Sequence, residues 1–185
     1  YRKYYKLALN SNVSMIRASM VNKFYDCSNY EICLDNIETL INHLQTYPHD
    51  LNALPILSDL IVSKDKFKIQ DKEIKIDESF IRYLVNNDTI YSHSKYQFLT
   101  TLGPKVKAYL PHLLQQPPAT HFDVKSYLSM LTAIDHQSSA VKAIVKNSLK
   151  SKEAVVRSAG AIVTYNYYGG SLKKLVTELK GLDVY

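Results

Sequence analysis

Apolar positions recur along the chain with the period of one-sided helices, in segments that end at prolines, glycines or small polar residues. In the segment SSAVKAIVKNSLK the apolar or small residues follow one another at helical steps, as the stripe Val141, Ile144, Val145, Ser148 and Leu149. The lysines of the same segment lie on the opposite side, at Lys142, Lys146 and Lys150. Such a segment predicts a helix that buries one face and leaves the other in solvent.

The same periodicity predicts helices through most of the chain, and their short connections favour antiparallel neighbours. They lie near residues 2–9, 13–26, 31–46, 51–63, 78–86, 94–102, 104–115, 121–134, 138–150, 153–167 and 171–181. Pro48 marks one helix end, because proline lacks the backbone N–H that a helix interior needs. Asp50 is predicted to cap the helix that follows, and Thr120 with Asp123 is predicted to form a capping box.

One segment departs from the helical pattern. In DKFKIQDKEIKID, residues 65–77, apolar residues alternate with charged ones, which is the period of a strand. This predicts a small β-hairpin near 67–76. A charged insertion between two helices is an equally supported interpretation, and an insertion at one edge of a helical array is also a common place for a binding element.

Two stretches of the chain share one pattern, SNVSMIRASMVNKFY at 11–25 and SKEAVVRSAGAIVTY at 151–165. Laid on each other, they align Ser11 with Ser151 and Arg17 with Arg157, which indicates one structural unit used twice. The second stretch is apolar on nearly every side, so the pattern predicts a helix covered by neighbours before and after it. We interpret both arginines as structural, and Arg157 as satisfied by backbone carbonyls, because an unpaired buried guanidinium is too costly.

A family resemblance rests on FLTTLGPKVKAYLPHLLQQ, residues 98–116, and on residues 151–180 with their inner-helix arginine and small packing residues. These stretches resemble repeats of the HEAT (armadillo-type) helical family, most clearly over residues 90–182. The resemblance implies an all-α, right-handed α–α superhelix of about five antiparallel helix pairs. The family usually places an aspartate where Ser11 and Ser151 stand here, which implies a short or irregularly curved array.

The length of 185 residues with 46% hydrophobic content suits one domain over residues 1–185. The chain begins at Tyr1 without methionine, which predicts a mature product or a fragment of a longer chain. No run of eighteen or more apolar residues occurs, so no membrane-spanning helix is predicted.

The two cysteines, Cys27 and Cys33, are separated by five residues, which fits neither a redox pair nor a zinc site. A turn between antiparallel helices would bring them within disulfide range, and a disulfide would imply an oxidising compartment. Free thiols in a reducing cytoplasm are about equally well supported. The abundance of tyrosine and asparagine slightly favours an exported protein.

Charge and tyrosine content supply the candidate binding residues. The net charge is +6, and residues 101–185 carry all of the excess, with 11 Lys and Arg against 5 Asp and Glu. This favours a solvated basic face and leaves polyanion binding open. We take Lys142, Lys146 and Lys150 as candidates for an acidic partner, and Tyr167 and Tyr168, from a total of 15 tyrosines, as aromatic anchors. Four other tyrosines are predicted to lie in the core: Tyr5, Tyr25, Tyr127 and Tyr165.

No catalytic, cofactor or metal motif occurs in the chain: there is no HExxH, GxSxG, P-loop or GxGxxG. The HEAT-like glycosylases that act on alkylated DNA rely on cleft aromatics, tryptophan above all, and this chain has no tryptophan. The sequence therefore predicts a protein-interaction scaffold that is not an enzyme and that binds a protein partner on the concave face of a HEAT-like array. Two alternatives stay open: nucleic-acid binding through the basic C-terminal half, and an accessory domain that packs within a larger protein.

Overall fold

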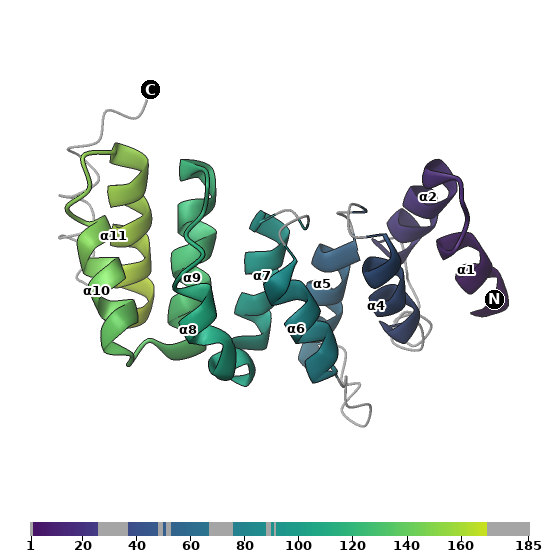
Figure 1. Cartoon of the computed structure of the whole chain (residues 1–185), viewed down its shortest axis with the longest axis horizontal. Helices are drawn as coiled ribbons and strands as arrows, with labels where there is room; N and C mark the ends of the chain where they lie inside the picture. Colours follow the sequence, from purple (N-terminus) through teal and green to yellow (C-terminus); the bar gives the residue numbers. More distant parts are fainter. Residues whose placement is uncertain are drawn as a thin grey trace. The chain divides into compact units, whose positions relative to one another are not determined.

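The structure is a computed structural model that describes residues 2–25, 37–47, 50, 53–66, 76–87, 90 and 92–169. Every regular element within these ranges is a helix (Figure 1). The predicted all-α class is therefore confirmed for this part of the chain. Within it, no helix is both long enough and apolar enough to cross a bilayer.

The chain divides into two compact units, residues 1–101 and 102–185. The first contains α1 (Arg2–Leu9), α2 (Ser14–Tyr25), α4 (Ile37–Thr46), α5 (Ala53–Lys66), α6 (Glu78–Asn86) and most of α7 (Ser92–Leu102). The second contains the 3₁₀ helix η1 (Gly103–Tyr109), α8 (Leu110–Leu113), the 3₁₀ turn η2 (His121–Asp123), α9 (Val124–Asp135), α10 (Ser139–Ser148) and α11 (Ala154–Tyr168). The single domain predicted over residues 1–185 stays a prediction, because a helical array also divides into such units.

In the first unit, α4 is the central element and packs against α1, α5 and α6, while α2 packs against α1 and α5. The apolar stripes meet in a core that includes Leu9, Leu40, Leu44, Leu57, Phe80, Leu84 and Phe98, all at most 1% exposed. The rings of Phe80 and Phe98 meet edge to face with centroids 6.0 Å apart. The hydroxyl of Tyr83 donates to the carbonyl of Leu44 at 3.1 Å, which joins α6 to α4.

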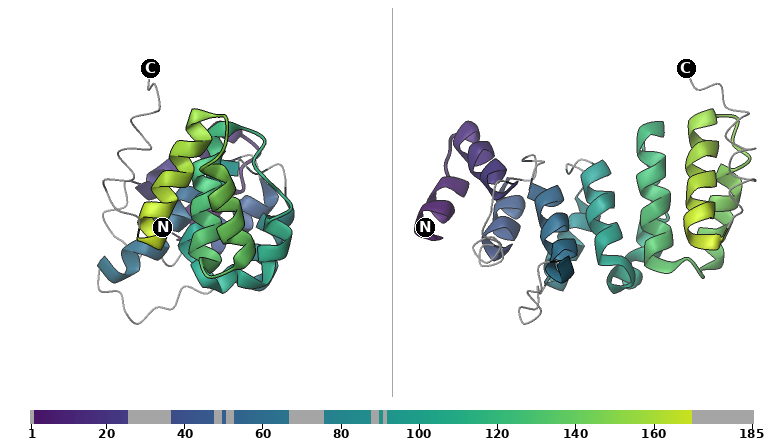
Figure 2. Two further views of the ribbon diagram at one scale, coloured as in Figure 1. Left: turned by 90° about the vertical axis from the view of Figure 1, so that its left-hand side faces the viewer. Right: turned by 180° about the vertical axis from the view of Figure 1, so that it is seen from behind.

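In the second unit, α9 is central and packs against η1, α8, α10 and α11. Figure 2 shows α10 and α11 side by side, in agreement with their contacts. Tyr127 is 4% exposed, which confirms its predicted place in the core, and its hydroxyl donates to the carbonyl of Leu113 at 3.0 Å. Gly160 of α11 lies so close to α10 that an added Cβ would be 3.2 Å from the backbone nitrogen of Leu149.

The prediction of one helix near 104–115 is wrong. The residues form η1 and then α8, and the backbone leaves helical geometry at Val106, where φ is −102° and ψ is 16°. Pro111 explains the break, because in the interior of one long helix it would remove a hydrogen bond and clash with the preceding turn. In the structure it stands in the first turn of α8, where proline is tolerated.

The predicted capping box at Thr120 and Asp123 is also not formed. The hydroxyl of Thr120 donates instead to the carboxylate of Asp123 at 2.9 Å. The side chain of Thr120 does not cap η2, and that of Asp123 does not cap α9. The predicted helix near 121–134 therefore starts as a 3₁₀ turn that continues into α9.

Some predictions fall outside the described residues. These are the pair Cys27 and Cys33, the helix near 171–181, residues 67–75 of the hairpin, and the first part of the helix near 31–46.

Candidate protein-interaction surface

The three candidate lysines lie in and just after α10, and all three are exposed. We call Lys142, Lys146 and Lys150 the lysine row. Their spacing of four residues places them along one side of the helix, while Val141, Val145 and Ser148 are buried on the side that packs against α9 and α11. The sequence of α10 contains no acidic residue. The local fold therefore presents three ammonium groups to solvent on a rigid helix.

The turn between α9 and α10 fixes the side chain of Lys142, the first residue of the lysine row. The ammonium of Lys142 donates to the side-chain oxygen of Gln137 at 3.0 Å. Just before it, the carboxylate of Asp135 accepts from Lys107 at 2.8 Å and from the backbone N–H of Gln137 at 3.1 Å. The hydrogen bond from Lys107 is the main cause that lowers the pKa of Asp135. The turn that leads into α10 is thus fixed by an ionised carboxylate.

The two candidate tyrosines at the end of α11 are both partly buried. The ring of Tyr168 packs against His136 of the α9–α10 turn, edge to face, with centroids 6.5 Å apart. Its hydroxyl is buried without a hydrogen-bond partner among the described residues. Burial, and next the nearby carboxylate of Asp135, raise the pKa of Tyr168. Tyr168 therefore supports the turn, and its hydroxyl is not presented to a partner as placed.

Tyr165 was predicted to lie in the core, and that prediction is wrong, because its side chain is 40% exposed. Tyr165 lies in the last turn of α11, beyond Val163, the last buried residue of that helix. The side chain of Tyr25, which was also predicted to lie in the core, falls outside the described residues. Tyr165 is thus the aromatic residue of α11 that solvent reaches most.

The two arginines predicted to be structural occupy equivalent positions. The guanidinium of Arg157 donates to the carbonyls of Ser151 and Lys152, each at 2.8 Å. The guanidinium of Arg17 donates to the carbonyl of Ser11 at 2.9 Å. Each serine hydroxyl accepts from the backbone N–H two residues later, at 3.1 Å for Ser11 and 3.2 Å for Ser151. Both segments therefore begin with the same serine turn and fold the arginine back onto it.

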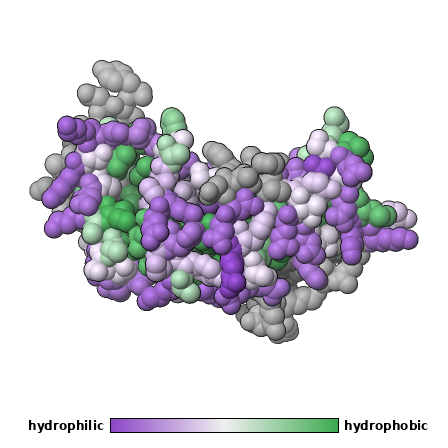
Figure 3. Space-filling model, in the orientation of Figure 1, coloured by the Kyte–Doolittle hydropathy of each residue, from purple (hydrophilic) through white to green (hydrophobic). Residues whose placement is uncertain are grey.

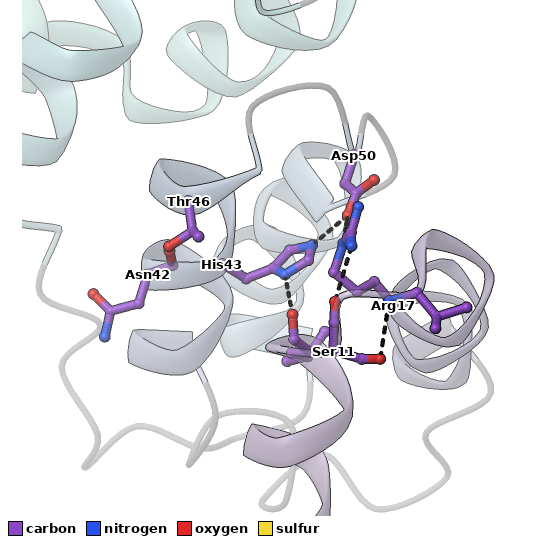
Figure 4. A network of polar contacts seen from close by, with 8 residues as sticks. Ser11, Arg17, Asn42, His43, Thr46 and Asp50 are labelled. Atoms are coloured by element: carbon purple, nitrogen blue, oxygen red, sulfur yellow. Dashed lines mark hydrogen bonds and ion pairs between the residues drawn. The ribbon is translucent and has the colours of Figure 1, made fainter.

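Arg17 also belongs to a buried polar cluster in the first unit (Figure 4). Its Nε donates to Asp50 Oδ2 at 2.8 Å, and its guanidinium carbon lies 3.8 Å above the ring of Tyr47. Asp50 directs its carboxylate to Arg17 and to His43. Its predicted role as a helix cap involves residues 51 and 52, which lie outside the described residues. We call Arg17, His43, Tyr47 and Asp50 the polar cluster. It joins α2, α4 and the segment before α5.

His43 is completely buried in this polar cluster. Its Nδ1 lies 2.8 Å from the carbonyl oxygen of Leu9, and its Nε2 lies 3.1 Å from Asp50 Oδ2, without hydrogen-bond alignment. Burial is the main cause that lowers the pKa of His43; Leu9 and Asp50 oppose it. Sequence reasoning missed the cluster because its members are separated by up to 33 residues.

The described residues hold no group of three or more His, Cys, Asp or Glu that could bind a metal ion. The described residues thus define an all-α chain with an exposed basic helix and a buried polar cluster. Comparison with protein-family models, with curated proteins and with solved structures gives no match. The HEAT-type resemblance therefore stays a prediction.

Proposed function

We propose that this protein is a non-enzymatic scaffold that binds an acidic segment of a protein partner through the lysine row of α10. The observation that carries the proposal is the exposure of Lys142, Lys146 and Lys150 on one face of a helix that contains no acidic residue. Like charges four residues apart on a helix repel one another, so a bound acidic segment relieves repulsion as well as adding attraction.

The buried side of α10 explains why this row is well suited to recognition. Val141 and Val145 are at most 3% exposed, so the helix is held against α9 and α11 and keeps its ammonium groups in register. Each exposed ion pair contributes only about 0.2–1 kcal/mol. The lysine row therefore acts mainly on the rate of association and on specificity. Apolar contacts must supply most of the binding free energy. Tyr165 and the partly buried Tyr167 are the aromatic residues of α11 available for such contacts.

We also propose that the helices continue as a HEAT-like superhelix of about five antiparallel pairs whose inner helices line a concave surface. The shared serine turn and arginine at the starts of α2 and α11 support one structural unit used twice. The short connections, such as residues 149–153 between α10 and α11, support antiparallel pairs. If the chain is instead an accessory domain of a larger protein, the same surfaces of this chain would contact a neighbouring domain of that protein.

The test is an affinity capture from a lysate of the producing cells, with nuclease-treated and untreated halves and identification by mass spectrometry. The variant is K142E/K146E/K150E. The matched control, K105E/K125E/K152E, makes the same charge change at exposed lysines of the same unit. The proposal expects a protein that survives nuclease, is lost with the lysine-row variant and is retained by the control. Equal loss with both variants would show nonspecific attraction and would reject the lysine row as the site.

Nucleic-acid binding is the second candidate, because the same three lysines would neutralise phosphates. In that case nuclease would remove the captured material. The affinity for a duplex would then fall steeply with added salt, since each neutralised phosphate releases counterions. A protein interface that also uses tyrosine would show a shallower dependence on salt.

A further inference from the structure

Exposed hydrophobic side chains are concentrated at one end of the first unit. Of nine large hydrophobic residues that are strongly exposed among the described ones, five fall between residues 4 and 16. They are Tyr4 (72% exposed), Leu7 (61%), Val13 (53%), Met15 (78%) and Ile16 (46%). Figure 3 shows hydrophobic side chains at the surface over α1 and α2. We call these five residues the apolar tip.

The charged residues of the segment that carries the apolar tip all have one sign. Residues 2–25 contain five basic residues and no Asp or Glu. Lys3, Lys6 and Lys23 are exposed, whereas Arg17 is turned inward to Ser11 and Asp50. On α1 the exposed lysines at 3 and 6 alternate with the exposed apolar residues at 4 and 7. A partner for this surface must therefore accept apolar side chains and carry negative charge.

The degree of exposure distinguishes between two kinds of acidic partner. Four of the five residues of the apolar tip are more than half exposed, so these side chains stand out from the backbone. Residues that line a groove for a partner helix would be largely covered by their neighbours. Farther along α2, Ser19, Asn22 and Lys23 are exposed and polar, so the apolar surface does not continue along the helix. Protruding side chains with basic neighbours suit a fluid layer that closes around them.

We propose that the α1–α2 end of the protein binds the surface of an anionic lipid membrane. The side chains of the apolar tip enter the boundary between headgroups and acyl chains. The ammonium groups of Lys3 and Lys6 stay at the level of the lipid phosphates and carboxylates. This binding is peripheral and does not depend on the lysine row of α10. A second copy of the chain fits poorly, because it would bring two basic surfaces together.

The apolar side chains and the lysines of this surface act as two separate signals for membrane binding. A few apolar side chains alone give weak and reversible binding, and a few lysines alone give attraction that salt screens. Binding therefore requires both signals. It should be strong to vesicles that contain phosphatidylserine at low salt and weak to pure phosphatidylcholine.

The test is sedimentation of the full chain with vesicles of phosphatidylcholine alone or with phosphatidylserine. K3Q/K6Q is expected to weaken binding to the anionic vesicles about tenfold or more, and Y4S/L7S/M15S to abolish it. Two controls keep the comparison matched. V62S removes an exposed apolar residue of the same unit outside the apolar tip, and K142Q/K146Q removes two lysines of the lysine row. Both are expected to bind like the unchanged chain.

Four results would overturn the proposal. The first is no sedimentation with anionic vesicles at low salt. The second is an equal loss in K142Q/K146Q or V62S. The third is binding that persists in Y4S/L7S/M15S, which would reduce the effect to charge alone. The fourth is self-association, measured by analytical ultracentrifugation, that Y4S/L7S/M15S abolishes, because the apolar tip would then cover itself with a second copy. Circular dichroism of each variant verifies that the helices are retained.

Discussion

The segments that begin at Ser11 and at Ser151 start alike and continue differently. Both form a serine turn, and in both an arginine six residues later donates to the carbonyl of that serine. In the first, Arg17 reaches on to Asp50 and Tyr47. In the second, Arg157 reaches the carbonyl of Lys152. The local hydrogen bonds therefore follow from the residues of the segment, whereas the remaining contacts depend on residues far away in the chain.

The helices that follow also differ in how completely they are covered. In α11, Ala159, Ala161 and Val163 are at most 3% exposed. At the equivalent places in α2, Ser19 and Lys23 are exposed and Val21 is buried. The covered helix carries small and apolar residues, and the half-covered helix carries polar ones. The difference shows that two helices can share a start and differ in how far their later faces are covered.

The largest effect should come from filling the close approach that α11 makes to α10. Gly160→Leu is expected to lower the free energy of unfolding by about 3 kcal/mol, because its side chain would overlap Ser148 and the backbone at Leu149. The equivalent change in the first segment, Met20→Leu, is expected to cost about 1 kcal/mol or less. Urea unfolding followed by circular dichroism measures both. Equal costs would mean that α11 is no more tightly packed than α2.

The next largest difference is expected between the substitutions of the two arginines. Arg17→Ala removes the partner of a largely buried carboxylate, and we expect it to cost about 2–3 kcal/mol. Arg157→Ala leaves two carbonyls near the surface and is expected to cost about 1 kcal/mol. Hydrogen exchange followed by mass spectrometry measures the protection of backbone amides in each unit separately. A larger loss of protection for Arg157→Ala than for Arg17→Ala would contradict the interpretation that the polar cluster makes Arg17 the more stabilising arginine.

The pH dependence of the first unit should follow His43. Burial holds its pKa below the ordinary 6.5, so the unfolded chain binds a proton that the folded chain resists. Stability is therefore full above pH 6.5 and falls as the pH drops below it. Hydrogen exchange of α1 and α4, corrected for the intrinsic rate, measures this decline, and His43→Gln should remove it. The control His136→Gln changes an exposed histidine of the second unit and should leave it in place.

The smallest effect is expected where the two segments are most alike. Ser11→Ala and Ser151→Ala each remove one exposed hydroxyl that accepts a backbone N–H, and each should cost about 0.5 kcal/mol. Thermal unfolding of the two variants provides the measurement. Costs that differ by more than about 1 kcal/mol would show that the serine turns are not equivalent.

The sequence was sufficient where short-range patterns decide the structure. The lysine row was predicted from the helical period alone and is exposed in the structure. The contacts of Arg157 to carbonyls stay within six residues, which a local argument can reach. The helical class follows from the same period, because an apolar stripe on a helix requires a neighbour that covers it.

The sequence was insufficient where contacts between distant residues compete with local preferences. The carboxylate of Asp50 pairs with Arg17, 33 residues earlier, and no local pattern indicates this contact. Tyr165 was predicted to lie in the core, yet its side chain is 40% exposed near the end of α11. The apolar tip was missed because only the arrangement of neighbours decides which apolar residues of α1, of α2 and of the segment between them are covered.

The tyrosine hydroxyls of the core give each unit its own optical reporter. The chain has no tryptophan, so its near-ultraviolet spectrum comes mainly from tyrosine. Tyr83 donates to a carbonyl within the first unit, and Tyr127 donates to one within the second. A phenol that loses such a bond on unfolding changes its absorption. Difference spectra of the unchanged chain against Tyr83→Phe and Tyr127→Phe, recorded as the temperature rises, isolate the contribution of each tyrosine. They would therefore show whether the two units melt together or one before the other.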